Sequence, residues 1–226
     1  MEKRGLSQEG LKMIACITML IDHVGAAITG NLWLRIVGRI AFPIFCFLIA
    51  EGAFHTRNPK RYGLRLFVGV LLAELPFDLM LYGRWTWASQ SVMLTLLLGF
   101  LYGQAAGRVE NLNIRVYLIV PFALAAEWLR TDYGGFGVML IALFILTREM
   151  PHRLAVQTMG MTLLCLFMGG AMLRLDSWNI PIELFAVAAM LPIACYHGAK
   201  KTASRWLQWA FYLFYPVHML VLFLIQ

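Results

Sequence analysis

Hydrophobic positions along the chain fall into long runs, separated by short connections that contain Gly, Asn and charged residues. Runs of about 20 apolar residues are long enough to cross a bilayer as helices. The pattern predicts an all-α, polytopic transmembrane helical bundle with a single domain over residues 1–226. Its nine predicted spans are 10–29, 33–54, 63–82, 91–107, 114–129, 134–147, 154–173, 179–196 and 206–225.

Composition agrees with a membrane location. Apolar residues make up 61% of the chain and charged residues 14%, whereas soluble domains are roughly half apolar and one quarter charged. The net charge of +7 is spread over short connections, so we expect a lipid bilayer and no nucleic acid as partner. The cysteines form no CxxC pair, and neither a disulfide framework nor a metal site is expected.

The distribution of Lys and Arg predicts the orientation, because cytoplasmic loops keep positive charge. Alternate loops on one side carry thirteen such residues, and loops on the other side carry three. We therefore expect a cytoplasmic N-terminus and an outward C-terminus in the bacterial inner membrane. A cleaved signal peptide is the alternative for the first span, but Lys12, Asp22 and His23 within it disfavour this alternative. The thirteen are Lys3, Arg4, Arg57, Lys60, Arg61, Arg65, Arg108, Arg115, Arg148, Arg153, Lys200, Lys201 and Arg205, and the three are Arg84, Arg130 and Arg174.

The predicted spans contain charged and titratable side chains that lipid disfavours. An ionised group at the centre of a span costs about 2.5 to 3.5 kcal/mol, so such groups face a bundle interior or a wet cavity. The sequence therefore predicts an internal functional site. The residues concerned are Lys12, Asp22, His23, Arg35, Arg39, Glu51, Glu74, Asp78, Glu127, Glu183 and His218.

Lys12 and His23 share one face of the first span, because eleven residues at about 100° each return to the same side of a helix. Cys16 and Met19 lie between them on this stripe. A long anionic ligand with a reactive end would meet the cation first and the imidazole deeper in, where it can act as a base. The alternatives are a snorkelling Lys12 and a purely structural His23.

Arg35 and Arg39 are one helical turn apart, just before Pro43, which is expected to kink the second span. Two guanidinium groups need anions. They either pair with buried carboxylates such as Asp22 or bind an anionic substrate or cofactor.

Acidic residues occur in the outer halves of later spans. Glu74 and Asp78 share a face across a kink expected at Pro76, and they have the same two interpretations as the arginines. The glycine-rich turn over residues 132–137 matches no phosphate-binding fingerprint. We expect this turn to bring Glu127 and Asp132 to the mouth of a cavity.

The inner connection over residues 55–61 is strongly basic. Topology signalling and contact with anionic lipid explain it most simply. Phosphate binding by Arg57, Lys60 and Arg61 is the alternative.

Six segments in this order resemble the TraX family, named for the membrane protein that acetylates the N-terminus of F pilin, and the likeness spans nearly the whole chain. They are LKMIA to IDHVG (11–25), GRIAFPIF (38–45), EG with HTRN (51–58), ELPFD (74–78), DYG (132–134) and YPVH (215–218). Lys12 and His23 are also similar to the arrangement of a basic residue, ten residues and a histidine in the wider membrane acyltransferases that modify sugars and lipopolysaccharides.

The resemblance implies acetyl transfer from cytoplasmic acetyl-CoA to an amine or hydroxyl at the membrane or its outer side. His23 would act as base or acyl carrier, assisted by Asp22. Lys12, Arg57, Lys60 and Arg61 would hold the CoA phosphates. The polar shell would comprise Arg35, Arg39, Glu51, Glu74, Asp78, Glu127, Asp132 and His218.

The acceptor stays open between a peptide or pilin N-terminus and a glycan. The chain departs from the sugar acyltransferases in length and in most later helices, and TraX relatives also occur without an obvious pilus substrate. A small proton- or ion-coupled transporter is the alternative function, because buried ionisable residues also mark ion pathways, but no inverted repeat supports it. A structural assembly factor is a third reading, and an oligomer is compatible with all three.

Overall fold

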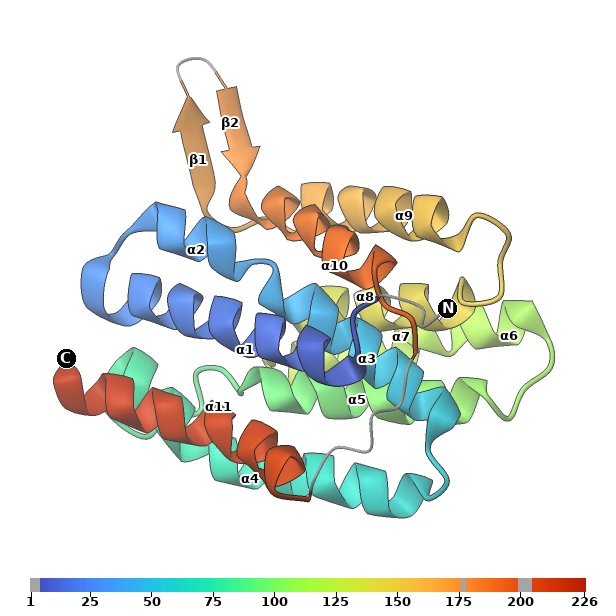
Figure 1. The fold of residues 1–226 in the computed structure, drawn as a ribbon, viewed down its shortest axis with the longest axis horizontal. Coiled ribbons are helices and arrows are strands. Elements are labelled where there is room, and N and C mark those ends of the chain that lie inside the picture. The colour runs from blue at the N-terminus through green and yellow to red at the C-terminus, as the bar shows by residue number, and fades with distance from the viewer. Residues whose placement is uncertain (1–4, 176–177, 199–204) are drawn as a thin grey trace. The chain divides into compact units, whose positions relative to one another are not determined.

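The computed structural model describes residues 5–175, 178–198 and 205–226. The predicted inner cations Lys3, Arg4, Lys200 and Lys201 lie outside this part of the chain. The described residues form helices and one short hairpin (Figure 1). In chain order these are α1 Gln8–Val24, the π-helical turn η1 Gly25–Thr29, α2 Leu32–Gly38, α3 Ala41–His55, α4 Pro59–Tyr82, α5 Val92–Ala106, α6 Leu112–Tyr117, α7 Ile119–Trp128, α8 Gly134–Leu146, α9 Arg153–Phe167, β1 Met172–Leu175, β2 Trp178–Pro181, the 3-10 helix η2 Ile182–Ala189, α10 Met190–Ala194 and α11 Arg205–Ile225.

Each predicted span is helical over most of its length, and the all-helical class is confirmed. The predicted spans were wrong over residues 168–173 and 179–181, because α9 ends at Phe167 and an antiparallel hairpin pairs Met172 with Pro181. Gly169 and Gly170 end the helix, since their φ angles of 61° and 114° are in the left-handed region that glycine tolerates. The next predicted span begins as a 3-10 helix rather than an α-helix.

Two helical segments among the described residues, Gln8–Thr29 and Leu32–His55, are long and apolar enough to cross a membrane. That the nine predicted spans cross a membrane and that the N-terminus is cytoplasmic stay predictions.

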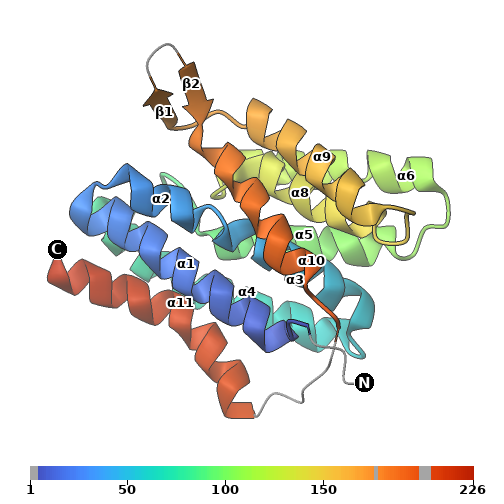
Figure 2. The ribbon, with the colours of Figure 1, turned by 45° about the horizontal axis from the view of Figure 1, so that its top comes forward.

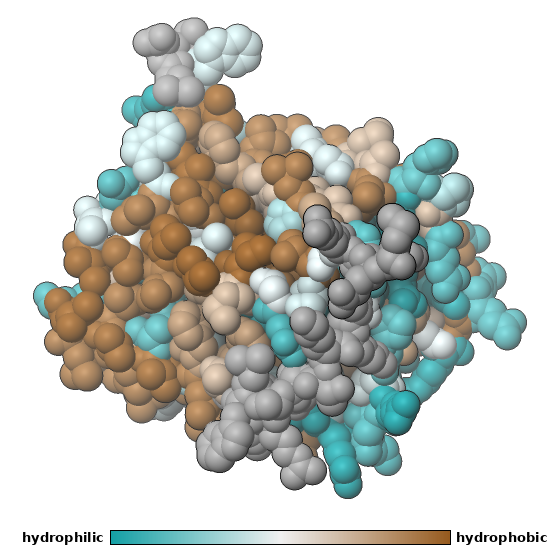
Figure 3. Space-filling view, in the orientation of Figure 1, coloured by the Kyte–Doolittle hydropathy of each residue, from teal (hydrophilic) through white to brown (hydrophobic). Residues whose placement is uncertain are grey.

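The surface of α4 also suits lipid. Leu66, Val70 and Ala73 are buried, while Leu71 and Leu75 on another side of the helix are 62% and 51% exposed. A helix that is apolar both towards the core and outwards is typical of a membrane environment. Figure 3 shows a similar apolar surface over α1 and α2.

The chain divides into two compact units. The first comprises Met1–Phe45 and Thr158–Gln226, and the second comprises Cys46–Gln157. The single domain that the sequence predicts over residues 1–226 therefore contains two units, and it stays a prediction.

In the first unit α1 packs against α2 and α11 (Figures 1 and 2). The two helices α1 and α11 run in the same direction, because Lys12 lies near Phe211 at one end and Gln226 donates a hydrogen bond to the Ala27 carbonyl at the other. A small core joins Ile36 of α2 to residues of β1 and η2. In the second unit α5 packs against α4, α7 and α8.

The kink expected at Pro43 is an interruption between α2 and α3. Proline has no N–H, and its ring clashes with the carbonyl four residues earlier, which here belongs to Arg39. The chain instead forms a tight turn, in which the Arg39 and Ile40 N–H groups donate to the Ile36 and Val37 carbonyls. In contrast, α4 continues without interruption past Pro76.

Candidate active site

The first helix of the site is defined by its two ends. Ser7 caps α1 by accepting a hydrogen bond from the Gly10 N–H at 3.1 Å. After Val24 the helix widens into the π-helical turn η1, and Gly30, with φ 62°, ends it. Short π-helical turns inside α-helices are frequent at functional sites, and this one, at the end of α1, begins two residues after His23.

The stripe predicted from Lys12 to His23 lies on one uninterrupted helix. Cys16 and Met19 between them are buried, and Lys12 and His23 are half-buried. The stripe faces α11, because the Lys12 ammonium lies 5.6 Å from the centre of the Phe211 ring and His23 contacts His218. The structure therefore confirms the helical geometry of the stripe and adds α11 as its neighbour.

His23 and His218 form a hydrogen-bonded pair. His23 Nδ1 lies 2.7 Å from His218 Nε2, and the planes of the two rings differ by 4°. The ring centres are 4.9 Å apart, which exceeds the nitrogen separation by about two ring radii. The two imidazoles therefore meet end to end in one plane, as a hydrogen bond requires.

The contacts of His218 assign the hydrogens of this pair. His218 Nδ1 lies 2.7 Å from the main-chain carbonyl oxygen of Phe214, which can only accept, so Nδ1 must be the donor. With both rings neutral, His218 Nε2 then has a lone pair and accepts from the Nδ1–H of His23. This assignment leaves His23 Nε2 unprotonated, with no hydrogen bond to any described residue. That nitrogen can act as a base or nucleophile.

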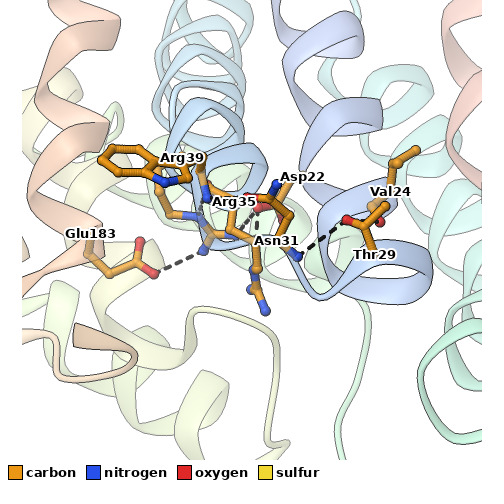
Figure 4. A network of polar contacts seen from close by, with 8 residues as sticks. Asp22, Val24, Thr29, Asn31, Arg35, Arg39 and Glu183 are labelled. Atoms are coloured by element: carbon orange, nitrogen blue, oxygen red, sulfur yellow. Dashed lines mark hydrogen bonds and ion pairs between the residues drawn. The ribbon is translucent and has the colours of Figure 1, made fainter. Parts of the chain in front are cut away.

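An ionic network in the first unit includes Asp22, the residue that precedes His23 in the sequence (Figure 4). One Arg39 nitrogen lies 2.6 Å from Asp22, and another lies 2.9 Å from Glu183 of η2. Arg35 lies 3.6 Å from the same Asp22 oxygen. Buried charges are stable only when they are paired and hydrogen-bonded, and this network joins α1, α2 and η2 in that way.

Close approach of α1 and α2 makes the network possible. A Cβ atom on Gly38 would lie 2.1 Å from the Asp22 Cβ, so only glycine fits there without displacement. The turn after Gly38 then directs the Arg39 side chain towards both carboxylates. Asp22 thus contacts Arg39 and Arg35, and no contact between Asp22 and His23 is present among the described hydrogen bonds.

Glu74 and Asp78 belong to the second unit, where each accepts hydrogen bonds from a nearby backbone. Glu74 accepts from the N–H and the hydroxyl of Ser91, the residue that precedes α5. Asp78 accepts from the Thr86 N–H at 2.9 Å. These contacts hold the connection between α4 and α5, which is a structural role of the kind that capping residues have.

Glu127 and Asp132 are placed in the same way. Glu127 accepts from the Gly135 N–H at 2.7 Å at the start of α8, where a carboxylate is favoured by the helix dipole. Asp132 accepts from the Tyr133 N–H at 3.1 Å. The four predicted outer carboxylates of the second unit therefore all support turns or helix starts.

Glu51 pairs with Arg148, which the sequence had placed only in a loop. Arg148 Nε lies 3.1 Å from one Glu51 carboxylate oxygen, and the other oxygen lies 3.4 Å from His55 on the next turn of α3. Arg148 and His55 are themselves 2.7 Å apart. This cluster joins the end of α3 to the residues after α8.

The predicted CoA-binding residues are divided between the units. Lys12 belongs to the first unit, whereas Arg57, Lys60 and Arg61 belong to the second and are exposed around the start of α4. Asn58 caps this helix by accepting from the Arg61 N–H at 3.0 Å. Figure 3 shows hydrophilic surface over this connection.

Sequence reasoning left Glu183 and the Phe214 carbonyl out of the site. Glu183 was visible as a lone carboxylate in an apolar segment, and such a group needs a cation. Its pairing with an arginine 144 residues away could not be read from spacing. Phe214 lies one helical turn before His218, so its carbonyl was within reach of that imidazole.

The protein is therefore of a helical class with exposed apolar helix faces, and it contains a buried ionic network and a histidine pair of which His218 is buried and His23 half-buried. Comparison with known proteins then identifies the family. The chain matches the family described as TraX protein over residues 7–226, and it belongs to that family.

The chain is 32% identical to the probable fimbrial assembly protein FimC, serogroup H1, of Dichelobacter nodosus, over 94% of this chain and 92% of that protein. It is 51% identical to an uncharacterized protein of Rickettsia prowazekii (strain Madrid E), over 18% of this chain and 16% of that protein. No solved structure matches the chain.

Proposed function

We propose that this protein is a multi-pass membrane acyltransferase of the bacterial inner membrane. It moves an acetyl group from cytoplasmic acetyl-CoA to an amine or hydroxyl at the membrane or its outer side. The proposal is supported most directly by the hydrogen bond between His23 and His218, since the contact of His218 Nδ1 with the Phe214 carbonyl then leaves the lone pair of His23 on Nε2, at the deep end of the Lys12 stripe.

The residues of the first unit suit this chemistry. The Lys12 ammonium can attract an anionic donor, and the two side chains between Lys12 and His23 on the stripe are the thiol of Cys16 and the thioether of Met19, which suits the neutral arm of CoA. His23 then removes the proton of the acceptor, or its Nε2 attacks the thioester and carries the acetyl group. In both routes the carbon–sulfur bond breaks and CoA leaves as its thiolate.

The ionic network supports the same site by position. Asp22 precedes His23 directly, and its pairing with Arg39 links α1 to α2 and η2. A reacting group must be held by packing and by supporting hydrogen bonds, and this network holds the helix that carries His23. Asp22 is thus a positioning residue in the proposal.

The relative named as a fimbrial assembly protein favours a peptide amine as acceptor, with the N-terminus of a pilin as the first candidate. The test uses full-length protein purified in lipid nanodiscs, labelled acetyl-CoA and synthetic peptides with a free or a blocked N-terminus. We expect label on the free peptide only.

The matched variants are His23→Gln, which removes the reacting nitrogen, and His152→Asn, which removes an exposed histidine in the second unit. Loss of general base catalysis lowers rates by about 10² to 10⁴-fold, so we expect such a loss in His23→Gln alone. Unchanged turnover in His23→Gln would remove His23 from the chemistry. Solute uptake driven by a proton gradient, without any binding of CoA, would replace the proposal with a transporter.

The two routes are separated by rapid mixing of the protein with acetyl-CoA alone, with the released CoA thiol measured over time. An acyl carrier releases one CoA thiol per protein in an initial burst, whereas a general base gives no burst. The measurement therefore decides the route whichever acceptor is used.

A further inference from the structure

His23 donates a hydrogen bond to His218, and His218 donates one to the Phe214 carbonyl, so both donors of this chain are oriented the same way. We propose that His218 is a positioning residue, which holds His23 in the Nδ1–H form and takes up the Nδ1 proton during transfer. The second half rests on the proposed function, whereas the first half concerns the resting protein and does not depend on any activity.

Packing fixes the orientation of the His218 ring. The side chain is buried, the Phe214 ring lies 4.8 Å away and nearly parallel to it, and the Tyr215 ring approaches edge-on at 5.8 Å. Next to it on α11, Met219 is fully buried. The imidazole therefore cannot exchange its two nitrogens without disturbing this packing, and Nδ1 stays on the Phe214 carbonyl.

This arrangement specifies which nitrogen of His23 reacts. The orientation of an imidazole is set by the bond that its other nitrogen makes. Here His218 Nε2 can only accept, so His23 Nδ1 must donate, and the lone pair is restricted to His23 Nε2. An isolated histidine would divide its hydrogen between the two nitrogens.

The proposed proton path is balanced. As the acceptor nitrogen or oxygen bonds to the acyl carbon, the carbon–sulfur bond breaks and CoA leaves as a thiolate. The acceptor proton passes to His23 Nε2, and the Nδ1 proton passes to His218 Nε2. His23 Nε2 then gives its proton to the thiolate, which releases CoA as a thiol. The proton on His218 Nε2 returns to His23 Nδ1, and the neutral pair is restored.

Two substitutions separate positioning from proton uptake. His218→Gln places an amide oxygen near the position of the ring Nε2, so it can still accept from His23 Nδ1–H but cannot take the proton. The side chain in His218→Asn is one carbon shorter than in His218→Gln. Its amide lies near the position of the ring Nδ1, so it can bind the Phe214 carbonyl but leaves His23 without an acceptor. The control is His152→Asn.

The first measurement is the tautomer of His23 by nitrogen-15 NMR of histidine-labelled protein in nanodiscs, with signals assigned by their loss in His23→Gln and His218→Gln. We expect a protonated Nδ1 and an unprotonated Nε2 for His23 in the unaltered protein, in His218→Gln and in His152→Asn. In His218→Asn we expect a shift towards the other tautomer. An Nε2–H form in the unaltered protein, or an unchanged tautomer in His218→Asn, overturns the proposal.

The second measurement is the acetyl-transfer rate of the same preparations. We expect a loss of about tenfold in His218→Gln, since positioning remains, and of about 100-fold or more in His218→Asn. Equal rates in the unaltered protein and in His218→Gln overturn proton uptake by His218. If no preparation transfers acetyl groups, both the proposed function and proton uptake by His218 are overturned. The tautomer of His23 still decides whether His218 is a positioning residue.

Discussion

Each unit contains an arginine that pairs with a carboxylate, and the two clusters differ in burial and in span along the chain. Arg39 is 7% exposed and joins Asp22 to Glu183, which lies 144 residues away. Arg148 is 24% exposed and forms an ion pair with Glu51 near the end of α3.

Burial determines what each cluster contributes to the fold. Exposed ion pairs contribute little, because water and salt already stabilise the separated charges. A buried network contributes little net stability over an apolar core, but removal of one partner leaves an uncompensated charge. The Arg39 cluster is therefore the one that specifies how α1, α2 and η2 fit together next to His23.

Removal of the Arg39 charge is expected to have the largest effect. Arg39→Met leaves Asp22 and Glu183 buried without their main partner, and we expect a loss of about 3 to 5 kcal/mol in the free energy of unfolding. Denaturant titration in detergent micelles measures it.

The control for this prediction is Arg84→Met, at an exposed position in the second unit, which is expected to unfold like the unaltered protein. Adding Asp22→Asn and Glu183→Gln to Arg39→Met should recover much of the loss, since no buried charge then remains. Equal stability of Arg39→Met and Arg84→Met would contradict the role of the network.

A substitution that only adds volume tests the close approach of α1 and α2. The new Cβ of Gly38→Ala would lie 2.1 Å from the Asp22 Cβ, and overpacking of this kind costs about 1 to 3 kcal/mol. Gly63→Ala is the matched control, because its Cβ would meet the Phe100 ring at an ordinary 3.4 Å. Melting temperatures of the two variants should differ, and similar values would show that the two helices can separate at no cost.

The regions that could be predicted from sequence are those controlled by local periodicity. Apolar runs located the helices, and the interval of eleven residues placed Lys12 and His23 on one face. Both depend only on the helical repeat. The hairpin after α9 was missed because Gly169 and Gly170 were read within an apolar run rather than as a stop.

The partners of the charges could not be predicted, since they depend on which elements meet. Spacing suggested that Glu74 and Asp78 act together, but each binds the backbone of the following connection. The choice of Glu183 for Arg39 needs the position of η2. The sequence identified Asp22, Arg39, Asp78, Glu183 and His218 as buried, but it was wrong about Glu127, which is exposed, and the fold determines the hydrogen bonds that these residues make.

The smallest effect is expected at Arg148. Arg148→Met removes the ion pair with Glu51 but retains an apolar side chain to cover the Phe54 ring, over which the guanidinium lies at 4.5 Å. Because Glu51 still lies 3.4 Å from His55, we expect a loss of about 0.5 to 1 kcal/mol at low salt. Since salt screens partly exposed pairs more than buried ones, the loss should shrink in high salt, while that of Arg39→Met should persist. Unfolding titrations at two salt concentrations measure both, and a salt-independent loss at Arg148 would mean that the two clusters are alike.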